Sequence, residues 1–393
     1  MIKEYNDDSL NRLIESYKGK PKDIDLPFIK ELYVFEKNID NLTNEGKMKV
    51  FHNLSLGLSL DHIDGHDQDL PNAILYDEKA ENIAEVLIED GSFYMPEYLY
   101  NRGHLYARNQ DNKIAEEIFS KYIYLKHKDD AVFTDERATY YGFHTVDIHV
   151  INDLMMGNIS LRDPTCFNDP FDTLLFHYID YQQKKIFKVA EYDIQPFRDA
   201  YKHIKVGCFA KDKIVNGKID EKDKAFRNIL MWSHYANSHK GICIRYKLNS
   251  KAIKRFQTQN TFTNLYEVKY KKNVGLQDES SATTRKLFAT KQEDWDYENE
   301  VRILHFDPEN DDEFLQLSLE KIEGKIEAIF FGYRCSDKDK ELIKNLLADK
   351  GIEFFDFIKD PEKIYSQYVK PFRLKPISIF PFIHRLKPCG NSF

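Results

Sequence analysis

The chain of 393 residues lacks several features that would assign it to a class at once. It contains no run of about 18 apolar residues, so no segment is predicted to span a membrane. Its first eight residues lack the apolar core of a secretion signal, which predicts a cytoplasmic protein. The five cysteines are an odd number at wide spacings that match no disulfide or zinc pattern, as expected in a reducing compartment.

Excess positive charge and the common catalytic signatures are also missing. The net charge of −8 argues against a general electrostatic grip on nucleic acid, although it leaves room for a local basic groove. There is no glycine-rich phosphate loop, nucleophile elbow or Cys/His catalytic pattern. The pairs His144/His149 and His234/His239 lie five residues apart rather than the four of a helical zinc site, so no metal site is predicted.

The composition, with 42% apolar and 31% charged residues, is that of a folded globular protein. In its first third, apolar residues recur at helical spacing over 41–62, 78–89 and 95–108. A further stripe over 115–125 completes a helical hairpin that resembles one tetratricopeptide (TPR)-like repeat. We expect residues 1–135 to form a helical, TPR-like domain that binds a protein partner. A plain helical subdomain is the alternative.

From residue 136 to 393 the pattern changes to strands alternating with irregular helices. The strands are expected at 139–145, 206–210, 242–248, 264–270, 298–306, 328–332 and 352–358. The helices are expected at 147–156, from Asp169 and Pro170 to about 189, at 280–291 and at 337–349. Several strands have the length and alternation of antiparallel pairs, which predicts an α+β fold with a mixed or antiparallel sheet in a catalytic domain.

The most distinctive segment is MWSHYANSHKG at residues 231–241, which directly precedes a predicted strand. It brings together imidazole, aromatic, hydroxyl, amide and ammonium groups, as many binding sites do. Trp232, Tyr235 and His239 lie at helical spacing, and Gly241 would end that helix. The alternative is an aromatic-rich core helix whose histidines are hydrogen-bonded within the protein.

Two further groups are candidates for chemistry. Glu298, Glu300 and Arg302 alternate along a predicted strand and would share one face, with neighbouring carboxylates about 7 Å apart. One carboxylate would react while the other positions or deprotonates an acceptor, and Arg302 would orient Glu300 or hold a phosphate. A solvated charged face is the alternative. His144 and Thr145 end a strand and would bind a ribose or phosphate, unless His144 is a hydrogen-bonded core residue.

Several motifs occur in one order along the chain: NDPF at 168–171, CFA at 208–210, MWSHYA at 231–236 with Gly241, and Trp295 with Glu298 and Glu300. Together they resemble a widespread bacterial domain family of unknown function, over about residues 138–335. That domain in turn resembles a divergent ADP-ribosyltransferase fold. The second resemblance implies a His or Arg on the first core strand, then a Ser- or Tyr-bearing element, then a Glu on a later strand.

His144 matches the first of these positions, the 208–235 segment the second and Glu300 the third. Ala210 stands where a Ser is more usual, and the pattern leaves open which of Ser233, His234 and Tyr235 takes the middle role. The resemblance implies NAD as the substrate, with Glu300 and Glu298 as catalytic carboxylates. The residues expected to bind NAD are His144, Thr145, Trp232, Ser233, His234, Tyr235 and Arg302, with the aromatic rings stacking on nicotinamide.

The resemblance therefore implies an NAD-dependent ADP-ribosyltransferase or NAD glycohydrolase, in a toxin or phage-defence effector whose helical region senses a partner. The acceptor stays open among protein, DNA, RNA and water. One alternative is a non-catalytic ligand- or protein-binding module. The other is a nucleic-acid-processing enzyme that uses His234, His239 and the carboxylates, with or without a metal.

Overall fold

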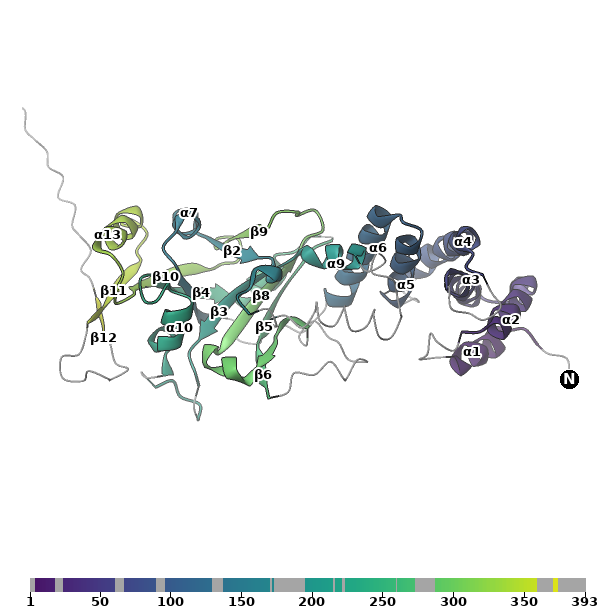
Figure 1. The fold of residues 1–393 in the computed structure, drawn as a ribbon, viewed down its shortest axis with the longest axis horizontal. Helices are drawn as coiled ribbons and strands as arrows, with labels where there is room; N and C mark the ends of the chain where they lie inside the picture. The colour runs from purple at the N-terminus through teal and green to yellow at the C-terminus, as the bar shows by residue number, and fades with distance from the viewer. Residues whose placement is uncertain are drawn as a thin grey trace, which may run out of the picture.

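The computed structural model describes residues 4–17, 24–60, 67–89, 96–128, 137–169, 172, 195–214, 216–220, 223–258, 260–272, 287–358 and 370–373. The molecule is elongated, with a helical region at one end and a sheet region at the other (Figure 1). This arrangement confirms the predicted α+β class.

The helical region contains α1 (Asp7–Ser16), α2 (Leu26–Lys37), η2 (Ile39–Asn41), α3 (Asn44–Ser59), α4 (Leu70–Glu89), α5 (Pro96–Arg108) and α6 (Asn112–His127). Local sequence starts the first three α-helices, because Asn6, Asp25 and Thr43 each accept a backbone N–H at the helix N-terminus. The helices α5 and α6 form the expected hairpin, while its likeness to a TPR repeat stays a prediction.

The sheet region is built on one mixed sheet. Its strands are β1 (Arg137–His144), β2 (Asn158–Arg162), β3 (Ile204–Lys211), β4 (Ile242–Asn249), β5 (Phe262–Glu267), β8 (Glu300–Phe306), β9 (Phe314–Ser318), β10 (Lys325–Phe331), β11 (Glu353–Ile358) and β12 (Lys370–Arg373). The main path runs β12-β11-β10-β4-β1-β3-β2-β9, and β8 joins β3 to β5. Strands β6 (Lys269–Lys271) and β7 (Thr290–Gln292) form a separate pair.

Short helices flank the sheet. They are α7 (Ile148–Met156), η3 (Pro164–Cys166), α9 (Gln195–Lys202), η7 (Ala225–Arg227), α10 (Ile229–His234), α11 (Ser250–Arg255), η9 (Glu293–Glu298) and α13 (Asp337–Leu346). Gly157 ends α7 in a left-handed conformation (φ 68°), as the sequence predicts. In Figure 1, α7 lies above the sheet and α10 below it, in the part of the sheet away from the helical region. Helix α9 lies next to α6.

The sheet splits along one edge of β3. The other edge of β3 pairs with β8 along its length, from Ile204–Phe306 to Ala210–Glu300. On the split edge, β2 pairs near the start of β3, at Val206, whereas β1 pairs near its end, at Ala210 and Lys211. The two strands therefore diverge from one neighbour, and a gap opens beside the middle of β3.

Two predicted elements differ from the structure at points that matter for the site. The helix expected over 231–241 ends at His234, because Asn237, Ser238 and His239 adopt left-handed φ values of 46°, 54° and 69°. Gly241 is therefore no helix cap. Its missing side chain permits a close approach, since a Cβ there would lie 2.0 Å from the carbonyl oxygen of His144.

The strand expected over 298–306 begins only at Glu300, because Glu298 ends η9 and Asn299 is left-handed (φ 46°). Of the helix expected over 280–291, residues 290 and 291 are in β7 instead, and residues 280–286 lie outside the described residues. Most of the helix expected to start at Asp169 and Pro170 also lies outside them.

The helical and sheet regions share a hydrophobic core. One cluster of buried side chains joins Phe119 of α6, Phe197 and Tyr201 of α9 and Phe306 of β8. A second cluster, with Ile244 of β4 and Ile303 of β8, packs on the sheet itself. The helices are thus anchored to the sheet through α9, and the proposed division into domains 1–135 and 136–393 stays a prediction.

Candidate active site

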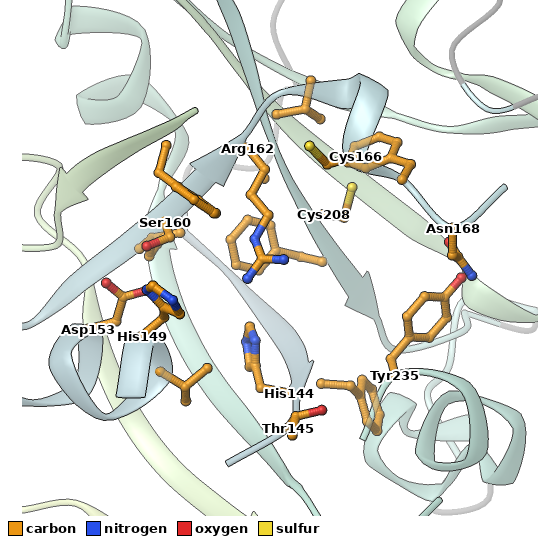
Figure 2. Close-up of a pocket in the computed structure, with 18 of the residues that line it drawn as sticks. His144, Thr145, His149, Asp153, Ser160, Arg162, Cys166, Asn168, Cys208 and Tyr235 are labelled. Atoms are coloured by element: carbon orange, nitrogen blue, oxygen red, sulfur yellow. The ribbon is translucent and has the colours of Figure 1, made fainter. Parts of the chain in front are cut away.

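A cleft of about 950 Å³ opens at the split in the sheet. Its walls come from β1, α7, β2, the middle of β3, α10 and η9. Figure 2 shows Tyr235 on one side of the cleft and His149 with Asp153 on the other, while His144 and Arg162 lie between them. Glu298 and Glu300 line the same cleft as His144.

His144 is the last residue of β1, and its ring extends into the cleft (Figure 2). Its Nε2 atom is buried and has no hydrogen-bond partner among the residues that the structure describes. Burial, and then the positive charge of Arg162, lower the pKa of His144 to about 4. The imidazole is therefore neutral at pH 7, and its Nε2 faces the backbone at Gly142 rather than the open cleft. Thr145 follows it at the exposed lip of the cleft.

Gly142 makes room for this ring. A Cβ at Gly142 would lie 2.5 Å from Nε2 of His144 and 3.2 Å from Cε2 of Tyr246. The distance of 2.5 Å is shorter than any contact that a Cβ atom makes in folded proteins, so a side chain at this position would collide with the ring. The glycine thus lets the imidazole fold back along β1.

A buried cluster of five charged side chains lies at the cleft next to Tyr235, and all of them except Arg302 line it. Its members are Asp172, Lys291, Glu298, Glu300 and Arg302, each at most 8% exposed. Lys291 Nζ lies 2.6 Å from Glu298 Oε2, 3.2 Å from Glu300 Oε2 and 3.2 Å from Asp172 Oδ2. Arg302 Nε donates to Glu300 Oε1 at 2.8 Å, and its Nη2 donates to Asp172 Oδ2 at 2.7 Å. Three carboxylates thus share two cations.

The two glutamates have opposed pKa shifts. Burial, and then the charge of Glu300, raise the pKa of Glu298, and Lys291 offsets only part of this rise. Burial also raises the pKa of Glu300, but Arg302 and Lys291 outweigh it, so the pKa of Glu300 lies below its ordinary value. Two carboxyl groups whose pKa values are shifted in opposite directions suit different roles. Glu300 stays ionised, and Glu298 exchanges a proton more readily.

Tyr235 and His234 line the cleft at the end of α10. The Tyr235 hydroxyl donates to Glu298 Oε1, which ties the aromatic ring to the acidic cluster. His234 is exposed, and its Nδ1 lies 2.8 Å from the hydroxyl of Tyr297. The predicted placement of Tyr235, His234, His144, Thr145, Glu298 and Glu300 around one cavity therefore agrees with the structure, while their roles stay predictions.

Trp232, Ser233 and Arg302 do not line the cleft, contrary to the expectation for NAD-binding residues. Trp232 is 3% exposed, and its Nε1 donates to the carbonyl of Phe226 at 2.7 Å. Trp232 is a core residue. Its ring packs edge-on against Phe143 and is not free to stack on a ligand. Ser233 Oγ donates back to the Ile229 carbonyl at 3.0 Å within α10.

Arg302 is fully buried and saturated by Glu300, Asp172 and the carbonyl of Phe288. Of its two predicted roles, orienting Glu300 agrees with these contacts, whereas holding a substrate phosphate does not.

Arg162 is a cleft residue that sequence reasoning missed. It ends β2, and its guanidinium extends into the middle of the cleft above His144 (Figure 2). It packs over the ring of Phe314 at 5.1 Å and makes no ion pair within the described part of the chain. The alternation of Ile159 and Leu161 after Gly157 is the signal that could have revealed this strand.

Comparison with known proteins identifies one domain. A family model described as a protein of unknown function (DUF2971) matches residues 231–303, from α10 to β8. This match confirms the predicted relationship to a domain family of unknown function, and the matched segment contains Tyr235, Glu298 and Glu300. No curated protein matches the chain, and no solved structure does.

Two classes of feature are absent from the described residues. None of their helices combines the length and apolar character needed to cross a membrane. Nor do three or more of their His, Cys, Asp or Glu side chains gather in an arrangement that would hold a metal ion.

Proposed function

We propose that the cleft binds NAD and that the protein cleaves its bond between nicotinamide and ribose, transferring ADP-ribose to an acceptor or to water. One observation carries the proposal. A single cleft brings His144, at the end of the first core strand, together with two carboxylates whose pKa values are shifted in opposite directions.

The carboxylates suit the charge changes of this reaction. When the C1′–N bond breaks, nicotinamide leaves with the bonding electron pair, and positive charge develops on the ribose. Glu300, held ionised by Arg302 and Lys291, would stabilise that charge. A new bond then forms between C1′ and an acceptor or water. The proton released goes to Glu298, whose raised pKa favours accepting it.

The cleft also matches the polarity of NAD. Its carboxylates lie next to Tyr235, where the cationic nicotinamide ring would stack on an aromatic face. Arg162 and His144 lie farther along the cleft (Figure 2), and the guanidinium of Arg162 extends into it. This guanidinium would bind the anionic pyrophosphate through charge-assisted hydrogen bonds, and His144 would add a neutral one once its ring turns Nε2 away from Gly142. On this proposal the helical region binds a protein partner, as in a toxin or phage-defence effector.

The test is release of nicotinamide from NAD by the full chain. Glu300→Gln should lower the rate by about 10²- to 10³-fold, since it removes one preorganised electrostatic group. Glu313→Gln is the matched control, because Glu313 lines the same cleft but is exposed. Thermal unfolding of each variant shows whether the fold survives. A wild-type protein that releases no nicotinamide would rule out the catalytic proposal.

A second candidate is a cleft that binds a ligand without catalysis. Both oxygens of Glu300 already contact Arg302 or Lys291, as they would in a purely structural ion network. Titration calorimetry distinguishes the two candidates. A cleft that only binds should show binding of NAD or another ligand, and the ligand should remain intact. Nothing in the geometry favours a nucleic-acid-processing centre built on two histidines: His234 lines the cleft, while His239 contacts Ser233 outside it.

A further inference from the structure

We propose that a second hollow, adjoining the cleft at Glu298, binds single-stranded nucleic acid and presents it as the acceptor. The hollow has a volume of about 300 Å³ and shares Ala210, Met231 and Glu298 with the cleft. Its role as an acceptor site rests on the proposed function, whereas its binding of nucleic acid does not.

The hollow is rich in cations. Lys213, Lys224 and Arg227 line it, in addition to Lys211, which pairs with Glu267. Lys224 and Arg227 lie on the ring of Phe226, 6.0 and 5.4 Å from its centroid. Glu298 is paired with Lys291, as Lys211 is with Glu267, which leaves Lys213, Lys224 and Arg227 against two acids, Asp223 and Asp296. In a chain of net charge −8, such a local excess creates a site for phosphates.

Aromatic rings connect the hollow to the cleft. Tyr297 lines the hollow. The ring centroids of Trp295 and His234 lie 6.0 and 5.9 Å from the ring centroid of Tyr297. His234 lines the cleft and contacts the Tyr297 hydroxyl, so the aromatic row crosses the boundary between the two cavities. Aromatic faces beside a basic groove bind single strands, because every base can stack on them. A duplex cannot present its paired bases in this way.

The walls of the hollow are held in place by side-chain hydrogen bonds. Asp212 Oδ1 accepts from the Ala225 N–H at 2.8 Å. Asn228 Nδ2 donates to the Tyr297 carbonyl at 2.6 Å, and Asn299 Nδ2 donates to the Lys211 carbonyl at 2.8 Å. The hollow is thus preformed, which lowers the entropic cost of binding.

These positions define the transfer step. A base or hydroxyl bound in the hollow lies across Glu298 from the proposed ribose position. Its nitrogen or oxygen forms the new bond to C1′ as nicotinamide leaves, and its proton passes to Glu298. The reaction needs no co-reactant other than NAD and the nucleic acid.

Binding is tested without NAD, by fluorescence anisotropy of the full chain with a labelled 12-nucleotide strand, as DNA and as RNA. The double variant Lys213→Glu/Lys224→Glu should bind about tenfold or more weakly, with a salt slope reduced by about one to two. Trp295→Ala should also bind about tenfold more weakly, but with an unchanged salt slope, because stacking is not electrostatic. The control is Lys113→Glu on α6, away from the hollow. It makes the same charge change as either of the two substitutions alone, and this variant should bind like the wild type.

Three outcomes overturn the binding site: no binding by the wild type, equal binding by the double variant, or preferential binding of polyglutamate, which would indicate an acidic protein partner. A second arm adds NAD labelled on adenine and follows transfer of the label to the strand. If the strand binds as expected but nicotinamide is never released, the proposed function fails while the binding site stands. Nicotinamide release without labelling of the bound strand overturns its role as acceptor.

Discussion

The helical region and the sheet region each bury a cluster of ion pairs, and the cluster of the sheet region borders the cleft. In the helical region, Arg102 of α5 bridges two acids of α4: its Nε lies 2.8 Å from Asp77 Oδ2 and its Nη2 lies 2.7 Å from Glu81 Oε2. In the sheet region, Lys291 and Arg302 serve three carboxylates, and Lys291, Glu298 and Glu300 line the cleft.

Shifted pKa values occur in both clusters. Burial raises the pKa of Asp77 to about 6 despite the opposing charge of Arg102, much as burial raises the pKa of Glu298. A perturbed pKa therefore does not distinguish a structural cluster from a site. What differs is access to a ligand: Glu298 and Glu300 line the cleft and can act on a molecule bound there.

The largest expected effect concerns the arginine of each cluster. Arg302→Met leaves Glu300 and Asp172 buried with one fewer cation, which should lower the free energy of unfolding by about 3–5 kcal/mol. Arg102→Met should cost about 1–3 kcal/mol, since the Glu81 side chain is 36% exposed and can turn to water. Urea unfolding measures both. A larger loss for Arg102→Met would contradict the distinction between the clusters.

A slightly smaller effect concerns histidines and pH. The pKa of His144 is lowered to about 4 and that of His104 to about 3, in both cases chiefly by burial. The unfolded chain takes up a proton below about pH 6.5, whereas the folded protein does not until its own lower pKa is reached. The free energy of unfolding should thus fall by about 3 kcal/mol per such histidine as the pH drops from about 6.5 to about 4.

Substitution separates the two histidines. His144→Gln should flatten the pH dependence with little loss at pH 7, because Nε2 of His144 has no partner among the described residues. His104→Gln should flatten it too, but should also destabilise the protein at pH 7, since this ring packs edge-on against Phe119 at 5.1 Å. Unfolding curves at several pH values test this contrast, and equal losses at pH 7 would refute it.

Two glycines sharpen the comparison further. A Cβ at Gly103 of α5 would lie 2.3 Å from the fully buried ring of Phe119, so Gly103→Ala should cost about 1–3 kcal/mol of stability. Gly142→Ala should cost less, because the imidazole of His144 lines the open cleft and can rotate away from the new methyl group. It should instead slow nicotinamide release by about 10- to 100-fold through misplacement of that ring. Calorimetric unfolding and the release assay, run on both variants, should give opposite rankings.

Local pattern was enough to predict much of the fold. Amphipathic spacing indicated α3 to α6, the run ending at His144 indicated β1, and Gly157 marked the end of α7. Each of these signals depends on residues within one or two turns of one another. The same holds for the grouping of Glu298, Glu300 and Arg302, which are neighbours in the chain.

The rest depends on contacts that local pattern does not contain. Helical spacing placed Trp232 and Tyr235 on one helix but could not say that Trp232 faces the core. Nor could it show that Asn299 breaks the strand, or that Lys291 and Asp172 join the acidic cluster from separate segments. The cleft itself arises because β1 and β2 pair with different parts of β3, a long-range choice of register.

The smallest expected effect concerns a hydroxyl in each region. The hydrogen bond from Tyr235 lowers the pKa of Glu298, so Tyr235→Phe should raise that pKa further above its ordinary value. Glu298 would then be protonated up to a higher pH, and nicotinamide release at pH 7 should fall about fivefold, as expected for loss of about 1 kcal/mol. In α5, the Tyr98 hydroxyl contacts the Asp77 carbonyl at 3.5 Å and does not line the cleft, so Tyr98→Phe should leave the release rate unchanged.

The measurement is the pH profile of nicotinamide release for the wild type and both variants. Loss of a merely structural hydrogen bond would lower the rate equally at every pH. If Glu298 takes up the proton, loss of the Tyr235 hydrogen bond should shift the acidic limb of the profile toward higher pH. The reason is that only ionised Glu298 can take the proton from the ADP-ribose acceptor. If Tyr235→Phe slows release without moving that limb, Glu298 belongs with Asp77 as part of a structural cluster, and Glu300 is the one carboxylate left to carry the chemistry.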